Sequence, residues 1–266
     1  MPTAARLSLL LFLGSLLFAE SSATAGMQNV RFCLHAKPAF SPTDAIPSLC
    51  DNPATAEIEP NYSPNFENLP CDQYMVNAPL GPSAVYLVVA QAGEEGVAGV
   101  GFGIYYNGSA TDSDPGQAIW GIVSSQTTWT SCANGVSYPN SDGVHGDFPE
   151  TGGGVRVTWN TQTSCANQVI GDKGVHAVVG CFQVYAYSST VMSITPNNNI
   201  QGPYPEITVA DCSGGTTDYY PLLGPYQLST ILARVQFGSG SGGYNPCSVT
   251  PAQPSTWGKL KGRYKR

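Results

Sequence analysis

Short runs of β-branched and aromatic residues, bounded by Gly, Pro, Asn and Asp, recur along the chain after its first 25 residues. Continuous helical periodicity is missing from the same region, so the pattern favours strands over helices. Strands are expected at residues 30–34, 85–91, 97–106, 119–123, 155–159, 175–187, 191–194, 207–210 and 230–237. Many short strands separated by turn residues are typical of a sandwich, so the sequence predicts an all-β fold of two antiparallel sheets.

The expected strand at 175–187 is apolar on both faces, which predicts a central strand that is covered on both sides. Strict alternation places Cys181 on the same face as Val179, and Phe182 on the same face as Val178. In the strand at 155–159 apolar and polar residues alternate strictly, and Arg156 is expected on the solvent-exposed face.

The strand 97–106 has one face without side chains. Its first face carries Val100, Phe102, Ile104 and Tyr106, and its second face carries Gly99, Gly101, Gly103 and Tyr105. Glycine destabilises a strand by about 0.5–1 kcal/mol relative to alanine, so three glycines in register indicate that something lies close to the backbone there. One interpretation is that a neighbouring aromatic residue, Trp120 or Trp129, covers the gap. The other is that a partner chain or a sugar ring packs on the bare face.

The first 25 residues have the form of a secretory signal peptide. Arg6 precedes the apolar run 7–18, and Ala23-Thr24-Ala25 supplies the small residues that signal peptidase recognises. We expect cleavage after Ala25. The apolar run is shorter than the roughly twenty residues that span a bilayer, and no later segment comes closer, so no transmembrane segment is expected. The mature protein is expected to be secreted or associated with the cell surface.

An exported chain with an even set of eight cysteines is expected to form disulfides. We expect the pairs Cys132 with Cys165 and Cys212 with Cys247, because each would tie a Gly- and Asn-rich loop to its neighbour. No cysteines form a CxxC pair and the three histidines are far apart in sequence, so no metal site is expected.

The predicted organisation has four parts. Residues 1–25 are the signal peptide, 26–84 an N-terminal strand and loop-rich segment, 85–237 the sandwich body, and 238–266 a Gly/Ser linker with a basic tail. The chain has 18 Asp and Glu against 11 Lys and Arg, for a net charge of −7, and the basic residues concentrate in the tail. An acidic body argues against nucleic-acid binding, which needs a basic groove.

The tail combines aromatic, apolar and basic residues after the flexible "GSGSGG" stretch. Trp257, Leu260 and Tyr264 follow a helical i, i+3, i+7 spacing, with Lys259 and Lys261 between them. A short amphipathic basic segment of this kind can dock on an anionic envelope or on a sorting partner. Gly258 and Gly262 weaken a helix, so a disordered, solvated tail is the alternative.

The stretch "VYLVVAQAGEEGVAGVGFGIYYNG" at 85–108 resembles the opening of a cohesin-type module. The segments "GVHAVVGCFQVYAY", "VMSITPNNN" and "ITVADCSGG", with the tail "STWGKLKGRYKR", resemble a group of uncharacterised exported bacterial proteins. The cohesin resemblance implies a jelly-roll sandwich that binds a partner protein through one sheet face, without catalysis. The eight cysteines, the loop-rich segment 36–83 and the missing dockerin motif depart from that pattern.

Motifs for enzymatic chemistry are missing from the sequence. It has no GxSxG, HExxH, P-loop or GxGxxG motif, so no enzyme and no cofactor are expected. His145 with Asp142 and Asp147 is the one group to test for hydrolysis. Asp112 and Asp114 have the spacing of a calcium loop, but its other ligands are missing.

The sequence therefore predicts a secreted, non-catalytic binding or assembly protein whose partner is a protein or glycan at the cell surface. The alternative is a carbohydrate-binding module that uses exposed aromatic rings, since flat rings stack on sugars. The candidates for that role are Trp120, Trp129, Tyr219, Tyr220 and Tyr226.

Overall fold

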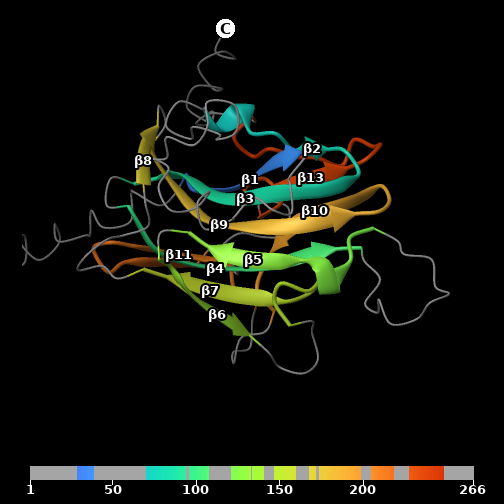
Figure 1. The fold of residues 1–266 in the computed structure, drawn as a ribbon. Coiled ribbons are helices and arrows are strands. Elements are labelled where there is room, and N and C mark those ends of the chain that lie inside the picture. Colours follow the sequence, from blue (N-terminus) through green and yellow to red (C-terminus); the bar gives the residue numbers. More distant parts are fainter. Residues whose placement is uncertain are drawn as a thin grey trace, which may run out of the picture.

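The structure is a computed structural model in which the strands form two facing sheets (Figure 1). It describes residues 29–38, 70–93, 96–107, 121–132, 134–140, 147–159, 168–171, 174–198, 205–218 and 228–248. Within these ranges no helix is long and apolar enough to cross a membrane. The prediction of an all-β, two-sheet sandwich is confirmed.

The first sheet has five strands and is called the β9 sheet below. Its order is β1 (Arg31–Pro38), β3 (Gly81–Ala92), β9 (Gly174–Ala186) and β5 (Thr128–Ser131), all antiparallel, and β8 (Gln168–Gly171) also pairs with β9. Strand β3 is therefore paired along both edges and lies in the middle of this sheet.

The second sheet has eight strands and is called the β4 sheet below. Its strands are β12 (Thr216–Asp218), β11 (Thr208–Asp211), β4 (Val97–Tyr106), β10 (Thr190–Thr195), β13 (Arg234–Phe237), β2 (Asn77–Ala78), β7 (Gly154–Thr158) and β6 (Val136–Asn140). Strands β11 and β10 follow one another along one edge of β4, and β7 pairs with the other edge. The pair β13 and β2 is parallel, and the other pairs of this sheet are antiparallel.

The main core lies between the two sheets. Strand β4 contributes its large apolar residues to this core, and β9 contributes Phe182. Phe102, Phe148, Phe182 and Trp129 meet there with ring centroids 4.4–5.8 Å apart. Aromatic pairs at these separations stabilise a core beyond their buried area.

A second apolar cluster covers the outer face of the β9 sheet. Tyr86 and Cys181 from the sheet pack there against Cys71, which begins the 3-10 helix η2 (Cys71–Gln73), and against Tyr74, which follows it. Cys247, near the end of the described chain, joins the same cluster. The prediction that β9 is central and covered on both sides is confirmed by these two clusters.

The predicted alternation within β9 is wrong beyond Val179. The register with β3 shifts there, because Leu87 pairs with Gly180 while Val88 pairs with Val178. A β-bulge of this kind inserts one residue and reverses the faces that follow it. As a result Phe182 joins the main core, and Cys181 turns to the outer cluster.

The predicted disulfide between Cys212 and Cys247 is wrong, because Cys247 is bonded to Cys71, with their Cα atoms 5.6 Å apart. The side-chain amide of Asn245 donates to the Cys71 carbonyl oxygen at 2.7 Å, and this contact brings the late segment beside η2. Cys132 and Cys212 each take part in a disulfide as well. The expected partner of Cys132, Cys165, lies outside the described residues.

Strand boundaries differ from prediction at several places. The stretch expected as a strand at 119–123 is described only from residue 121, where Ile122 forms an isolated bridge ahead of the 3-10 helix η3 (Ser124–Gln126). Residues 238–243, expected to be a flexible linker, are tied to β13 because Gly242 N–H donates to the Gln236 side chain at 3.1 Å. Strands β2, β5, β6, β8 and β12 were not predicted.

Candidate functional site

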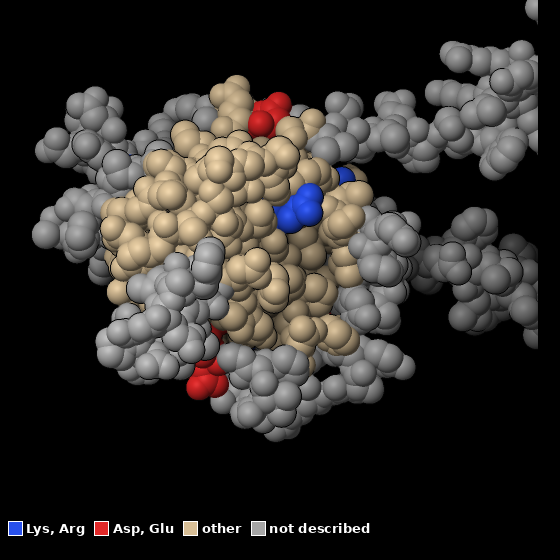
Figure 2. Space-filling view, turned by 90° about the vertical axis from the view of Figure 1, so that its right-hand side faces the viewer, with Lys and Arg blue, Asp and Glu red and all other residues tan. Residues whose placement is uncertain are grey.

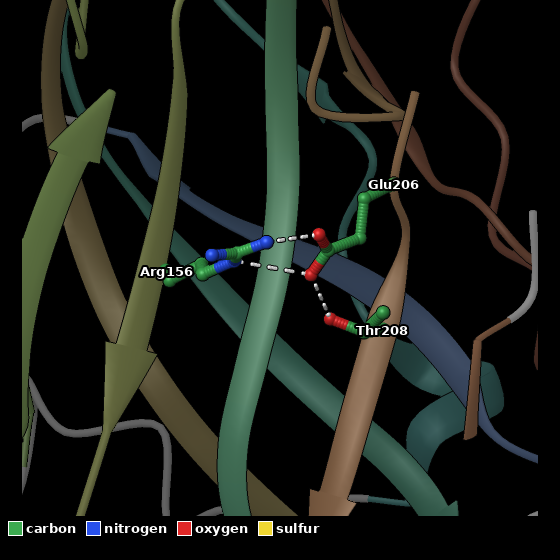
Figure 3. A network of polar contacts seen from close by, with 3 residues as sticks. All are labelled: Arg156, Glu206 and Thr208. Carbon is green, nitrogen blue, oxygen red and sulfur yellow. Dashed lines mark hydrogen bonds and ion pairs between the residues drawn. The ribbon is translucent and has the colours of Figure 1, made fainter. Parts of the chain in front are cut away.

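The bare face of β4 points away from the core and is crossed by an ion pair. Gly101 pairs with Arg156 of β7 on one side and with Thr208 of β11 on the other. Figure 3 shows the Arg156 guanidinium reaching across the middle strand to the carboxylate of Glu206. That carboxylate lies over Gly101, because a Cβ there would come within 2.9 Å of Oε1 of Glu206. The glycine therefore leaves room for a polar contact that spans three strands.

The contact between Arg156 and Glu206 is bidentate. Nε of Arg156 donates to Oε1 of Glu206 at 3.2 Å, and Nη2 donates to Oε2. The Thr208 hydroxyl donates to the same Oε1 at 2.8 Å. The hydrogen bond to Glu206 raises the pKa of the Arg156 guanidinium, and burial partly offsets this rise, so Arg156 stays charged across the physiological range.

The other glycines of this face also lie close to neighbours. A Cβ atom on Gly103 would come within 2.6 Å of the Pro196 carbonyl oxygen, whereas a Cβ on Gly99 would meet the Ala210 Cβ at an ordinary 3.4 Å. The three glycines are all buried. The glycine face of β4 therefore lies directly beneath polar groups of the same chain and is not an empty surface.

The prediction that Trp129 covers these glycines is wrong. Trp129 belongs to the other sheet, where its ring lies on Phe182 and directly over Gly180, and its Nε1 donates to the Ser137 hydroxyl at 3.1 Å. The other expected cover, Trp120, lies outside the described residues. Glu206 and Thr208 cover Gly101, and the segment at Pro196 covers Gly103.

Two rows of exposed or half-buried side chains lie beside this ion pair on the outer face of the β4 sheet. In the first row Tyr138 of β6, which is 55% exposed, is paired with Arg156. In the second row Tyr105 of β4, which is 54% exposed, is paired with Ser193, and Ser193 with Arg234. The Arg234 guanidinium lies 5.4 Å from the centre of the Tyr244 ring. Tyr105, Tyr138, Arg156, Ser193 and Arg234 are called the docking face below.

A groove of about 290 Å³ opens beside the second row. Ser193 and Arg234 line it together with Leu228 and Leu232, which belong to the main core. An apolar floor with a serine and an arginine at its side can hold an apolar anchor and hydrogen-bond its polar end.

A pair of tyrosines not identified in the sequence lies on the other sheet, where β9 ends. Tyr185 and Tyr187 are 38% and 40% exposed, and their rings lie 4.5 Å apart at 34° to each other. The Tyr187 hydroxyl donates to the Gln126 side chain at 3.2 Å. Figure 2 views the side of the molecule that carries the β9–β10 turn and shows a described surface with few charged atoms. The alternation in "YAY" was the one signal for this pair.

A pocket of about 410 Å³ lies at the side of the sandwich between β5 and β6. Its lining includes Trp129, Phe148 and Pro149, with the hydroxyl side chains of Thr130 and Ser137. None of the described residues that line the pocket is charged, and Trp129 is only partly exposed because its ring also packs into the core.

The remaining predicted site residues lie mostly outside the described residues. These are His145, Asp142, Asp112, Asp114, Tyr219, Tyr220, Tyr226, Trp257, Lys259, Leu260, Lys261 and Tyr264. Asp147 is described and is exposed. Among the described residues no group of three or more His, Cys, Asp or Glu side chains is placed to hold a metal ion.

The two described histidines lie in the outer cluster beside Tyr74. The Tyr74 hydroxyl is hydrogen-bonded to Nδ1 of His176 at 3.2 Å, and Nδ1 of His35 accepts the Met75 N–H at 3.1 Å. Burial, helped by the charge of Lys37, lowers the pKa of His35 to about 4. His35 is therefore neutral at pH 7, and its ring holds the segment around Met75 against the sheet.

The chain matches no protein-family model and no curated protein. Comparison with solved structures finds cohesin domains of Acetivibrio cellulolyticus. A type II cohesin domain from its cellulosome is 11% identical with a TM-score of 0.30, over 54% of this chain and 82% of that one. The sixth cohesin of scaffoldin B, in complex with a Cel5 dockerin mutant, is 13% identical with a TM-score of 0.30, over 62% of this chain and 94% of that one. The type II cohesin dyad of the adaptor ScaA scaffoldin is 11% identical with a TM-score of 0.29, over 53% of this chain and 42% of that one.

Proposed function

We propose that the protein is a secreted, non-catalytic binding or assembly module that holds a partner protein on its docking face. The observation that carries this proposal is the second row, in which Tyr105, Ser193 and Arg234 follow one another across three strands beside an apolar groove. Tyrosine and arginine are enriched among the residues that dominate protein–protein binding energy, especially beside desolvated pockets.

The sheet holds these side chains on a rigid surface. Strand β4 is paired along both edges, and the Arg156–Glu206 contact ties β7 across it to the segment before β11. A face that is ordered before the partner arrives loses less conformational entropy on binding than a loop does. The partner is therefore expected to dock without rearranging the sheet.

Secretion to the cell surface is supported by the form of residues 1–25 and by the disulfide between Cys71 and Cys247. Disulfides persist in oxidising compartments and are rare in the cytosol. The basic tail, with Trp257, Lys259, Leu260, Lys261 and Tyr264, serves in this proposal as the segment that attaches the module to the envelope or to a sorting partner.

Binding of the fluorescently labelled mature protein to washed cells of its native host tests the proposal. A Tyr105→Ala/Arg234→Ala variant should bind at least about tenfold more weakly, which corresponds to about 1.4 kcal/mol. The matched control is Tyr185→Ala/Tyr187→Ala, which changes exposed residues on the other sheet and should bind as the wild type does. Protease treatment of the cells should abolish binding, and periodate treatment should leave it unchanged.

A carbohydrate-binding role is the second candidate, and the Tyr185–Tyr187 pair favours it. Two exposed rings beside the neutral side chain of Gln126 offer stacking surface and hydrogen-bonding groups without charge, as a sugar requires. The same cell-binding experiment separates the two roles: periodate-sensitive binding that is lost in Tyr185→Ala/Tyr187→Ala and kept in Tyr105→Ala/Arg234→Ala would establish the glycan.

A further inference from the structure

Three cysteine sulfurs gather on the outer face of the β9 sheet, although only two of them are bonded to each other. The disulfide joins Cys71 of η2 to Cys247, and the thiol of Cys33 on β1 lies beside it. The distance between Sγ of Cys33 and Sγ of Cys247 is 3.3 Å. Cys33 is buried, so its thiol lies against the disulfide inside the protein and not in solvent.

Gln91 approaches the same disulfide from β3. Its Nε2 donates toward Sγ of Cys71 at 3.7 Å and toward Sγ of Cys247 at 3.8 Å. Gln91 has φ of 60°, in the left-handed region, and lies where the register of β3 with β9 shifts between Val89 and Ala92. Such backbone is costly for a residue other than glycine, and bulges often redirect a side chain toward a functional group.

We propose that Cys33, Cys71 and Cys247 form an intramolecular thiol–disulfide exchange site. The thiolate of Cys33 attacks Sγ of Cys247, the Cys33–Cys247 bond forms, and the Cys71–Cys247 bond breaks. The proton of the Cys33 thiol ends on the released Cys71 sulfur, so no oxidant or reductant is consumed. Gln91 donates its amide N–H to the Cys71 sulfur as negative charge develops there.

The exchange changes which segment is held by a covalent bond. Before it, Cys247 ties the late segment to η2, and after it the same segment is tied to β1 of the sheet. The stretch from Cys71 to Tyr74 then keeps only its noncovalent contacts, such as the hydrogen bond from Asn245 to the Cys71 carbonyl. The released Cys71 sulfur becomes a buried thiol, which an alkylating reagent can mark once the chain is unfolded.

Burial sets the speed of this step. It raises the pKa of Cys33 well above that of a free thiol, and only the thiolate attacks a disulfide. Exchange should therefore be slow at neutral pH and should accelerate about tenfold for each pH unit, as the thiolate fraction does.

Disulfide mapping of the purified full-length mature protein tests the proposal. Samples held at a series of pH values are acid-quenched and unfolded in excess N-ethylmaleimide, which traps thiols before they rearrange, and their peptides are identified by mass spectrometry without reduction. We expect Cys33–Cys247 peptides and alkylated Cys71 to appear together and to grow with pH. Cys33→Ser should abolish the alkylation of Cys71, and the matched control Cys181→Ser, which changes a second buried free cysteine, should leave it unchanged.

A Cys71→Ser variant shows whether the remaining two sulfurs can bond in the folded chain. In a glutathione redox buffer, and with a wild-type circular dichroism spectrum, it should form Cys33–Cys247. The proposal is overturned if wild-type protein yields no Cys33–Cys247 peptide at any pH, even where Cys71→Ser forms that bond. It is also overturned if Cys71 is alkylated equally in Cys33→Ser, because its release would then not depend on the neighbouring thiol.

Discussion

Arg156 and Glu206 meet directly above Gly101, at the centre of the β4 sheet. A side chain at position 101 would occupy the space of the carboxylate, because a Cβ there would come within 2.9 Å of Oε1 of Glu206 and 2.5 Å of the Thr208 hydroxyl. The stability that glycine costs the strand is offset by the contact that it admits. The ion pair between Arg156 and Glu206 thus explains why this face of β4 lacks side chains.

Replacing Gly101 should disturb that ion pair. Gly101→Ala is expected to lower the free energy of unfolding by about 1–3 kcal/mol, because the new methyl group overpacks the site. Gly99→Ala is the matched control, since its Cβ would make an ordinary contact with Ala210 and alanine is favoured over glycine in a strand. Urea unfolding of the two variants measures the difference, and equal stability would contradict this explanation of the glycines.

The Arg156–Glu206 pair itself should contribute modestly. The Arg156 side chain is 49% exposed, so solvent screens the charges, and a double-mutant cycle with Arg156→Ala and Glu206→Ala should give a coupling energy of about 0.5–1 kcal/mol. The coupling should decrease in 1 M salt, where screening acts within about 3 Å. A coupling energy that is zero at low salt would show that the pair only fills space.

Acid should destabilise the protein through His35. Its pKa is lowered from 6.5 to about 4 in the folded chain, so between these values the unfolded chain binds more protons. The contribution of His35 to the free energy of unfolding is fully present above pH 6.5 and falls as the pH decreases toward 4. It amounts to about 3 kcal/mol in all. His35→Gln should therefore show a shallower loss of stability between pH 7 and pH 5 in urea unfolding. An unchanged slope would mean that His35 is not held neutral.

Asn245 should matter for the attachment of the late segment. Its buried side chain donates to the Cys71 carbonyl at 2.7 Å and accepts from the Cys247 N–H at 2.9 Å. Asn245→Ala leaves two buried groups without these bonds and should cost about 2–3 kcal/mol. The matched control is Gln73→Ala at an exposed position of η2, which should change thermal stability little. A loss no larger in Asn245→Ala than in Gln73→Ala would contradict this role.

The central features of the fold could be predicted because they depend on local patterns. Strand β4 occupies the predicted residues 97–106, its apolar face lies in the core, and Arg156 lies on an exposed face as its alternation indicated. The second cluster could not be predicted in the same way. It joins residues near Cys71 to residues near Cys247, which are 176 positions apart, and no local pattern reports such a contact.

The candidate site was predictable only in part. Three glycines in register indicated close contact with the backbone, which is correct, but they did not say that the contact is a carboxylate. Glu206 gave no signal, because it lies in an isolated bridge with Asn197 just before β11 rather than in an alternating strand. The exchange of the two faces of β9 after Val179 could not be predicted either, since a bulge leaves the composition of the strand unchanged.

The most direct test of the proposed function is photo-cross-linking in the native host. A photoreactive phenylalanine analogue replaces Tyr105 of the docking face in one strain, and Tyr187 of the other sheet in a second strain, with equal expression. We predict a cross-linked product of one defined mass, containing a second protein, from position 105 and none from position 187. Products from position 187 alone, or the same products from both positions, would contradict binding through the docking face.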